Sequence, residues 1–506
     1  MLEPISVSLE SLNLITLSPM LIAIVGALLI LVIDLFKETL DKTLYVMLTM
    51  LILFIDIGAT YSLNINERGF FDLMLVDGVS VVSQLIILLT SLFFIPLALT
   101  ASNKRFHEYA YPEYFALFLF MVAGFQFMVS TDNLILIFVG LETASLSLYT
   151  LIAMHNTKGA HEAAVKYFTM GALAAGFFLM GAVAIYALTG SVELYEVAKI
   201  LQSQGADEST LMLPVMGGVV LMLVAVGFKV SLFPFHMWTP DVYEGSSAPM
   251  AGYMSVVPKL AMVVVAMRIF GIYINLDIEA VSYLIIIIAV ITMTLSNMMA
   301  LVQKDVKRML AYSSISHAGF VMAALALGTT KANSSIFLYY AMFMVTNLGA
   351  FAMLWISQHK KKHFDERYDH PFEKFSGMIS ISPMAAVIMG IFMLSLAGVP
   401  PFSLFWGKLY LISSVVDFAV ATAETKYMVL AIIMVLNSAI AAYYYLKLIV
   451  YMFLKAPLAS ETVVYANQSR PLNVVIGVLA VVTISSIFYV QPLLEFITYL
   501  VSSSGY

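Results

Sequence analysis

Long apolar runs separated by short polar stretches make up most of this chain. An α-helix rises about 1.5 Å per residue, so roughly 20 apolar residues cross a hydrocarbon core about 30 Å thick. Fourteen such runs predict an all-α polytopic membrane protein with about 14 transmembrane helices. The runs lie at residues 15–36, 43–63, 79–99, 112–131, 133–153, 161–188, 211–233, 249–270, 279–302, 306–328, 334–356, 381–418, 427–454 and 473–491.

Two of these runs are expected to be broken by proline. The run at 381–418 is too long for one crossing and contains Pro400 and Pro401, so we interpret it as one broken twelfth helix; two separate helices are the alternative. In the seventh run, Pro234 follows Lys229 and removes a backbone N–H that a continuous helix would use. Freed carbonyls at membrane depth need water or polar side chains, so water is expected beside the lysine.

The two broken runs are five helices apart, which suggests an internal repeat. Because five is odd, the second copy of a five-helix unit would be inverted in the bilayer, as in many transporters. We therefore expect inverted five-helix repeats at 112–270 and 279–454. No linker rich in Pro, Gly or Ser divides the chain, so residues 1–506 are interpreted as a single membrane domain.

Composition excludes several classes of protein. With 61% hydrophobic and 11% charged residues, the chain does not resemble a water-soluble protein. It has no cysteine, so iron–sulfur clusters, disulfides and Cys-ligated zinc are excluded. No glycine-rich nucleotide fingerprint is present, and nothing indicates a nucleic-acid partner. Glu3 and Glu10 replace the basic segment of a signal peptide, so the first run is expected to be retained.

The positions of the basic residues predict the orientation. Cytoplasmic loops carry an excess of Lys and Arg. If the N-terminus is outside, 15 of the 25 basic residues lie in inner loops and 4 in outer loops. This favours a multi-pass protein of a bacterial inner membrane with its N-terminus outside. The other six basic residues fall within the spans, at Lys166, Lys229, Lys259, Arg268, Lys408 and Lys447.

Five ionisable residues lie well inside different runs: Glu142, Lys166, Lys229, Lys259 and Lys408. A charge near the bilayer centre costs about 2.5 to 3.5 kcal/mol on insertion scales, so such residues indicate function. We expect Glu142 to face Lys166, because a carboxylate offsets the cost of a buried ammonium. The later lysines have no obvious acidic partner in mid-span. Arg268, near the end of its run, is expected to extend its side chain to the interface.

Burial disfavours the charged form of an unpaired lysine, which makes such a group a candidate proton carrier. Pro258 lies beside Lys259 and would free the carbonyl of Met254 if the helix continued through it. The alternative is that each lysine simply donates a structural hydrogen bond to a neighbouring helix. That alternative is harder to sustain for four lysines together than for one.

Histidines and hydroxyls extend the polar series. Ser313, Ser316 and His317 share one helical face. Histidine titrates near neutral pH and can relay protons, so His317 and His236 are candidates; a hydrogen-bonded packing role is the alternative for each. The spacing of His359 and His363 could hold a metal ion, but the adjacent lysines favour an ordinary solvated loop, and no metal site is predicted.

Several motifs resemble the antiporter-like membrane subunits of complex I, the proton-translocating NADH:quinone oxidoreductase. Glu142, Lys229, Pro234 and His236 carry the resemblance, together with the motifs WTPDVYEGSSAP, VPKLAM, QKDVKRMLAYSSISHAGF and LAGVPPFSLFWGKLY. The likeness covers most of the chain. Within the family the chain is most similar to subunit N. It opens with LSPMLIAIVGALLILVIDLF, ends soon after the fourteenth run, and has Lys408 where subunit M carries glutamate.

The resemblance implies inverted five-helix repeats, broken helices 7 and 12, and a central polar axis. It implies that Glu142 pairs with Lys166 and modulates Lys229, and that Lys259 carries the proton at the centre. Lys408 would pass the proton to the outer exit, and His317 would belong to the connecting path. Quinone reduction elsewhere in the complex would drive pumping, with no cofactor in this chain and with subunits K and M as neighbours.

Three functions from different classes follow. The leading hypothesis is a non-redox, proton-translocating subunit of a complex I-type NADH:quinone oxidoreductase. The second is a subunit of a multi-subunit cation/proton antiporter. Sodium dependence of the activity, or co-purification with redox subunits, would separate these two hypotheses. The third is a structural membrane scaffold, which predicts that pumping survives replacement of Lys259. The electron donor, the quinone and the proton stoichiometry are not encoded in this chain.

Overall fold

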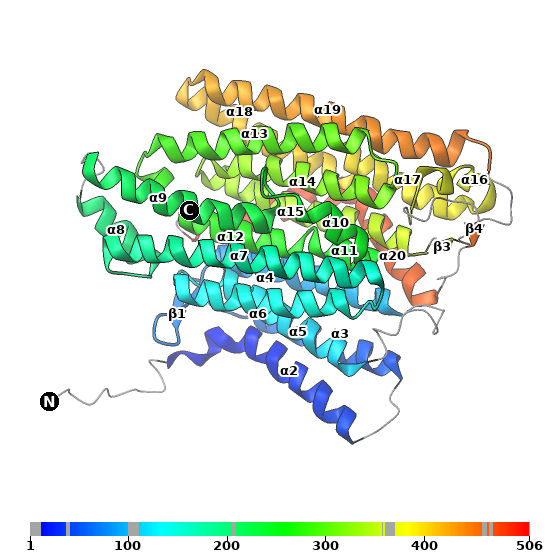
Figure 1. Cartoon of the computed structure of the whole chain (residues 1–506), viewed down its shortest axis with the longest axis horizontal. Helices are drawn as coiled ribbons and strands as arrows, with labels where there is room; N and C mark the ends of the chain where they lie inside the picture. The colour runs from blue at the N-terminus through cyan, green and yellow to red at the C-terminus, as the bar shows by residue number, and fades with distance from the viewer. Residues whose placement is uncertain are drawn as a thin grey trace.

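The helices run side by side in one bundle, with their ends gathered at two opposite faces (Figure 1). A computed structural model describes residues 12–36, 41–99, 111–204, 209–356, 358–359, 370–457, 463–464 and 469–504. One face carries the hairpin of β1 (Glu67–Gly69) and β2 (Met74–Val76), and we call it the hairpin face. The opposite face carries β3 (Gln358–His359), paired antiparallel with β4 (Val463–Val464).

The first helices form one side of the bundle. A 3-10 turn, η1 (Leu14–Leu17), leads into α2, and a second, η2 (Ile95–Ala98), follows α4. The capping box of Asp77 and Ser80 starts α4, since the Asp77 carboxylate accepts from the Ser80 N–H at 2.7 Å. The long helices here are α2 (Ser18–Leu35), α3 (Lys42–Tyr61) and α4 (Gly78–Phe94).

The segment expected to be the first repeat begins with α5 packed along α6. Asn133 caps α6 through the Ile135 N–H, and Thr157 caps α7, which ends at Gly190 with φ +70°. The helices are α5 (Pro112–Val129), α6 (Leu134–Ala153), α7 (Lys158–Thr189), α8 (Leu194–Gln204), α9 (Ser209–Val230), α10 (Trp238–Gly245), α11 (Ala248–Met254) and α12 (Val257–Asn275).

The segment expected to be the second repeat begins in the same way, with α13 packed along α14 as α5 is along α6. The 3-10 turn η4 (Phe372–Phe375) precedes α16 (Met378–Ile381). The helices of this segment are α13 (Glu279–Leu301), α14 (Val306–Leu325), α15 (Thr330–Ile356), α17 (Pro383–Ala397), α18 (Ser403–Thr422) and α19 (Thr425–Leu454). The inverted repeats at 112–270 and 279–454 and the single-domain interpretation stay predictions.

The expected all-α membrane fold is confirmed, and every predicted run contains a helix. Within the described residues, eleven helices are long and apolar enough to cross a bilayer. A twelfth span is formed if α20 (Arg470–Ile484) and α21 (Ser486–Ser502), which are bent by 79°, count as one. The difference from fourteen arises because the apolar part of α9 is short, α14 is more polar and the last span is bent. The predicted span at 473–491 contains this bend, which the sequence analysis did not predict.

Both predicted helix breaks are present. The seventh span stops at Val230 and resumes as α10, and the twelfth is divided between α17 and α18 around the two prolines. The eighth span is also interrupted, because α11 ends at Met254 and α12 starts at Val257. Pro258 therefore lies in the first turn of a new helix, where its missing N–H costs nothing, and the condition under which it would free the Met254 carbonyl is not met.

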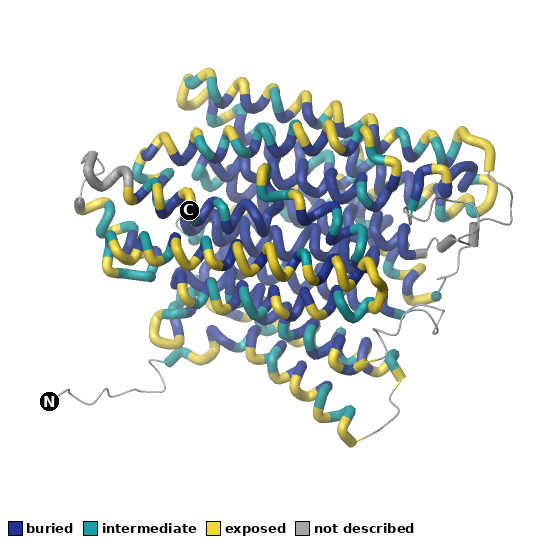
Figure 2. The backbone as a smooth tube through the Cα atoms, viewed as in Figure 1, coloured by how far each residue is buried: buried dark blue, intermediate teal, exposed yellow. Residues whose placement is uncertain are grey.

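The centre of the bundle is buried almost completely, whereas the outer helices expose apolar side chains (Figure 2). The most apolar stretch of α15 is entirely buried, and α12 is nearly so. By contrast, α2, α3, α7 and α19 present exposed Leu, Ile, Val and Phe side chains on one side. Such faces are expected to contact lipid tails or neighbouring membrane subunits.

Candidate proton pathway

Lys229 lies at the end of α9, just before the first helix break. Its side chain is buried, and its Nζ donates to Ser145 Oγ at 2.7 Å and to Tyr149 OH at 3.3 Å, both on α6. The ammonium also lies 5.3 Å from the centre of the Tyr167 ring. The Trp238 indole N–H bonds the Phe228 carbonyl at 2.9 Å, which satisfies part of the broken helix end.

Glu142 precedes Ser145 by three residues on the same face of α6. It is partly buried, its Oε1 has no hydrogen-bond partner, and Lys229 is the charge that acts on it. The predicted Glu142–Lys166 pair is wrong. Lys166 instead pairs with Glu162 at 2.7 Å and with Asp241 at 3.1 Å. Glu162, one helical turn before Lys166, and Asp241 on α10 are therefore the acidic partners of Lys166, in place of Glu142 on α6.

Asp241 and its neighbours form a charged group that sequence reasoning missed. Arg308 on α14 pairs with Asp241 at 3.0 Å and with Glu244 at 2.6 Å. The motif WTPDVYEG carried both acids, and their i, i+3 spacing could have indicated a shared basic partner. Together with Lys166, these residues tie α7, α10 and α14 together beside the first break.

Lys259 is buried in the first turn of α12 with only neutral oxygen partners. Its Nζ donates to the Ser314 carbonyl at 2.9 Å and to Ser314 Oγ at 2.7 Å. His317 follows Ser314 by one turn of α14. Its Nδ1 contacts the hydroxyl of Tyr339 on α15, and its Nε2 lies 3.1 Å from the hydroxyl of Tyr445 on α19. A histidine bonded through both nitrogens can accept a proton on one side and release one on the other.

Of the three residues predicted to share a face of α14, two share a partner. The Ser313 hydroxyl contacts Tyr445, which His317 also bonds, and Ser316 is buried on the same helix. Tyr339 then packs against the backbone of Gly407, the residue before Lys408. His317, Tyr445 and Tyr339 therefore form a polar group between Lys259, which bonds Ser314 one turn earlier on α14, and the start of α18.

Lys408 is held by the second helix break. Its Nζ donates to the Leu396 carbonyl at 2.8 Å. In a continuous helix that carbonyl would accept from residue 400, but Pro400 has no N–H, so the oxygen is available to the lysine. Gly398 terminates α17 with φ +82° and lies against the Lys408 side chain. Pro400 thus leaves free the carbonyl that Lys408 binds, a contact that the sequence analysis did not predict.

His236 occupies the first break but makes no contact with this set. Its ring stacks on Phe233, and its Nδ1 is buried without a hydrogen-bond partner. In the described part of the chain, no group of three or more His, Asp or Glu residues could hold a metal ion. His363, one of the two histidines with metal-ligand spacing, lies outside the described residues.

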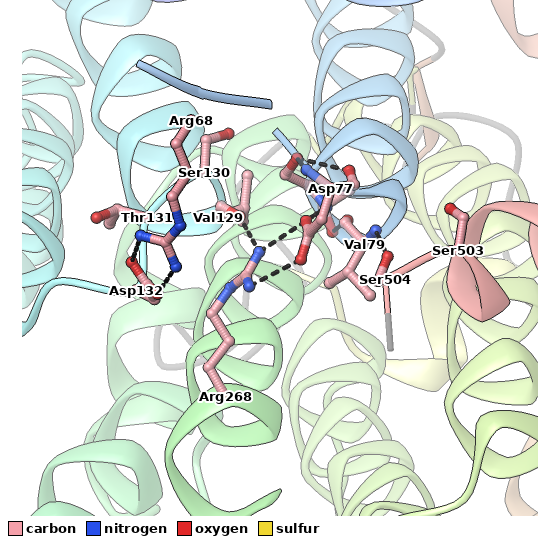
Figure 3. A network of polar contacts seen from close by, with 12 residues as sticks. Arg68, Asp77, Val79, Val129, Ser130, Thr131, Asp132, Arg268, Ser503 and Ser504 are labelled. Carbon is pink, nitrogen blue, oxygen red and sulfur yellow. Dashed lines mark hydrogen bonds and ion pairs between the residues drawn. The ribbon is translucent and has the colours of Figure 1, made fainter. Parts of the chain in front are cut away.

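The prediction that Arg268 reaches the interface is wrong. Its guanidinium is fully buried and binds both carboxylate oxygens of Asp77 at 2.9 Å, and it also donates to the Val129 carbonyl at 3.0 Å (Figure 3). The pair links α12 to the ends of α4 and α5 at the hairpin face. Sequence reasoning could not predict this pair, because Asp77 and Arg268 are 191 positions apart.

Residues 131–436 match the family model described as NADH:quinone oxidoreductase/Mrp antiporter, TM. The chain belongs to this family. One relative, NADH-quinone oxidoreductase subunit N of Sulfurovum sp. (strain NBC37-1), is 66% identical over the full length of both chains. The expected similarity to subunit N is thereby confirmed.

Solved structures show the same fold. A chain of respiratory complex I from Thermus thermophilus is 29% identical, with a TM-score of 0.76, over 94% of this chain and 98% of that one. A chain of the Mrp complex from Dietzia sp. DQ12-45-1b is 20% identical, with a TM-score of 0.79, over 97% and 98%. The second likeness concerns the fold alone.

Proposed function

We propose that this chain is a proton-translocating membrane subunit of an NADH:quinone oxidoreductase and carries no redox group itself. One observation supports the proposal above the others. Lys229, Lys259 and Lys408 are all buried, and within the described residues their Nζ atoms bond only neutral oxygens. A buried ammonium with no hydrogen-bonded carboxylate is costly in an apolar bundle, and we propose that the proton moves along these three lysines.

The groups between these lysines support an order of transfer. Glu142 lies on α6 one turn before Ser145, which accepts from Lys229, so an ionised Glu142 attracts the Lys229 ammonium. Lys259 bonds Ser314, and His317 lies one turn further along α14 with tyrosine hydroxyls at both nitrogens. Lys408 is the last group, and we propose that it passes the proton to the exit. Lys166 has two carboxylate partners and acts in this scheme as a positioning residue.

The relatives also support a place in a larger enzyme. Full-length relatives are subunits N, so we propose other membrane-arm subunits as partners, with subunits K and M as neighbours, in a bacterial inner membrane with the N-terminus outside. Glu162, Lys166 and Asp241 are between about two-fifths and two-thirds exposed on α7 and α10. Charges facing lipid are costly, so this face fits a polar neighbouring subunit.

Replacement of the central lysine tests the function. In Lys259→Ala, we expect the complex to assemble while proton pumping driven by NADH oxidation falls at least tenfold. Lys199→Ala is the matched control, because Lys199 is an exposed lysine of α8 paired with Glu196, and its pumping should equal that of the unmodified complex.

Two results would contradict the proposal. Unchanged pumping in an assembled Lys259→Ala complex would leave the lysine with a structural role only. Purification of the chain without redox subunits, with sodium-dependent exchange in vesicles, would support the antiporter alternative.

A further inference from the structure

A carboxylic acid lies buried in the membrane bundle away from the lysine row. Asp56 is on α3, the second long helix of the chain, and its side chain has no exposed surface. Among the described residues it forms no ion pair, and its partners are one amide and one hydroxyl. An ionised carboxylate placed in this way would carry an uncompensated charge in an apolar environment, so the neutral acid is the stable form.

The contacts of Asp56 fit a protonated side chain. Gln126 Nε2 on α5 lies 3.0 Å from each Asp56 oxygen, while Gln126 Oε1 is buried and has no partner. A protonated Asp56 can donate its O–H to that amide oxygen after a rotation of the amide, while Nε2 continues to donate to the other oxygen. Protonation thus supplies the one donor that the unpaired acceptor lacks.

A series of polar side chains leads from Asp56 to the hairpin face. Gln126 Nε2 lies 3.4 Å from Gln84 Oε1 on α4, and Gln84 Nε2 donates to Ser130 Oγ at 2.8 Å. Ser130 follows the end of α5, and its carbonyl accepts from the Leu75 N–H of β2. Figure 3 shows Ser130 beside Arg68, whose partly exposed side chain pairs with Asp132.

In the part of the chain that the structure describes, no comparable hydrogen-bonded series leads from Asp56 to the opposite face. The buried side of α3 continues from Asp56 through Leu53, and the next polar residue on that side is Thr49, about 10 Å away along the helix. Beyond it, Tyr45 contacts Asp34 of α2. Asp56 is therefore connected in one direction only.

The charges on the neighbouring helices are distant from Asp56. The elements packed against α3 are α2, α4, α5 and η2. α4 and η2 contain no titratable residue, Asp34 is the only one on α2, and α5 has Glu113 and Tyr114 in its first turn. Gln126 is about 20 Å along α5 from Glu113, so none of these groups sets the protonation of Asp56 directly.

From this geometry we propose that Asp56 is a second proton-binding site, separate from the lysine row, that exchanges its proton with water at the hairpin face. On release, the Asp56 O–H bond breaks and the proton leaves past Gln126, Gln84 and Ser130; on uptake the same bond forms again. Leu53 closes the route toward the opposite face. This site does not rest on the proposed pumping function, because its occupancy can be measured without turnover.

Infrared spectroscopy of the intact complex in proteoliposomes tests the site. The carbonyl band of a protonated, buried carboxyl should be present near neutral pH and absent from Asp56→Asn. The band should titrate when the buffer on the hairpin side is changed and not when the other buffer is changed. Glu113→Gln, which removes an exposed carboxyl of α5, should leave the band unchanged.

A second variant keeps the test informative if Asp56→Asn does not assemble. Gln84→Leu retains the carboxyl but cuts its link to Ser130, so proton exchange of the band in heavy water should slow at least tenfold. An Asp56→Asn spectrum identical to the unmodified one would overturn the proposal. Titration from the opposite side, or unchanged exchange in Gln84→Leu, would overturn it as well.

Discussion

The hydroxyl of Tyr149 reaches Lys229 only because residue 171 of α7 has no side chain. A Cβ at Gly171 would lie 2.0 Å from that hydroxyl, which is far inside van der Waals contact. Glycine is therefore required here for close approach and not for backbone freedom. Tyr149 can reach Lys229 because Gly171 has no Cβ.

Gly171→Ala should displace Tyr149 and remove one hydrogen bond from the Lys229 ammonium. Hydrogen bonds to charged groups contribute about 1.5 to 3 kcal/mol, so we expect pumping to fall by about tenfold or more. Gly176→Ala on the same helix is the control, since a Cβ there meets nothing within 4 Å. Equal pumping in both variants would show that the Tyr149 contact is dispensable.

The buried Arg268–Asp77 pair makes a different prediction, about stability. Removing one partner leaves the other as an unpaired buried charge, and Arg268→Ala should destabilise the subunit by about 3 to 5 kcal/mol. Lys331→Ala, which breaks the exposed pair with Asp417, should cost less than about 1 kcal/mol. Thermal unfolding in detergent compares the two, and similar losses would contradict the argument.

Sequence reasoning identified the buried lysines because charged residues are conspicuous in apolar runs. It assigned partners less well. Glu142 was matched to Lys166 on sign alone, whereas Glu162, one turn away on α7, and Asp241 on α10 lie closer to that lysine. The Arg268–Asp77 pair joins residues from different spans, and only the packing of α12 against α4 brings them together.

At the scale of the element, the breaks in the seventh and twelfth spans were predictable because proline removes a specific N–H. The interruption between α11 and α12 was not, since it precedes Pro258 and leaves no gap in the apolar pattern. The bend between α20 and α21 was missed because the apolar pattern continues across it. Periodicity and hydropathy report which residues are apolar, but they do not report where tertiary packing redirects a helix.

The second break predicts the effect of restoring an N–H. In Pro400→Ala, the new N–H can compete with Lys408 for the Leu396 carbonyl, so we expect pumping to fall severalfold while assembly persists. Pro383→Ala is the control, because Pro383 is the first residue of α17, where an N–H has no helical partner. Pumping at the normal level in Pro400→Ala would refute the coupling between the proline and the lysine.

At the scale of the molecule, the absence of cysteine makes orientation directly measurable. Asn64 precedes the β1–β2 hairpin and Lys158 starts α7, and both are exposed. With the N-terminus outside, a membrane-impermeant thiol reagent should label Asn64→Cys in intact cells and should label Lys158→Cys only after the membrane is opened. Labelling in the reverse order would invert the assignment of every loop.

The burial of α15 has a consequence for how the molecule is made. No residue in its most apolar stretch meets the surroundings of the finished bundle, yet that stretch is apolar enough to cross a bilayer alone. A helix enclosed by other helices can contain more polar residues than one exposed to lipid. We infer that α15 is apolar because it must insert into the bilayer before the other helices pack around it. Biosynthesis, as much as the folded state, therefore constrains which side chains the centre of this protein can use.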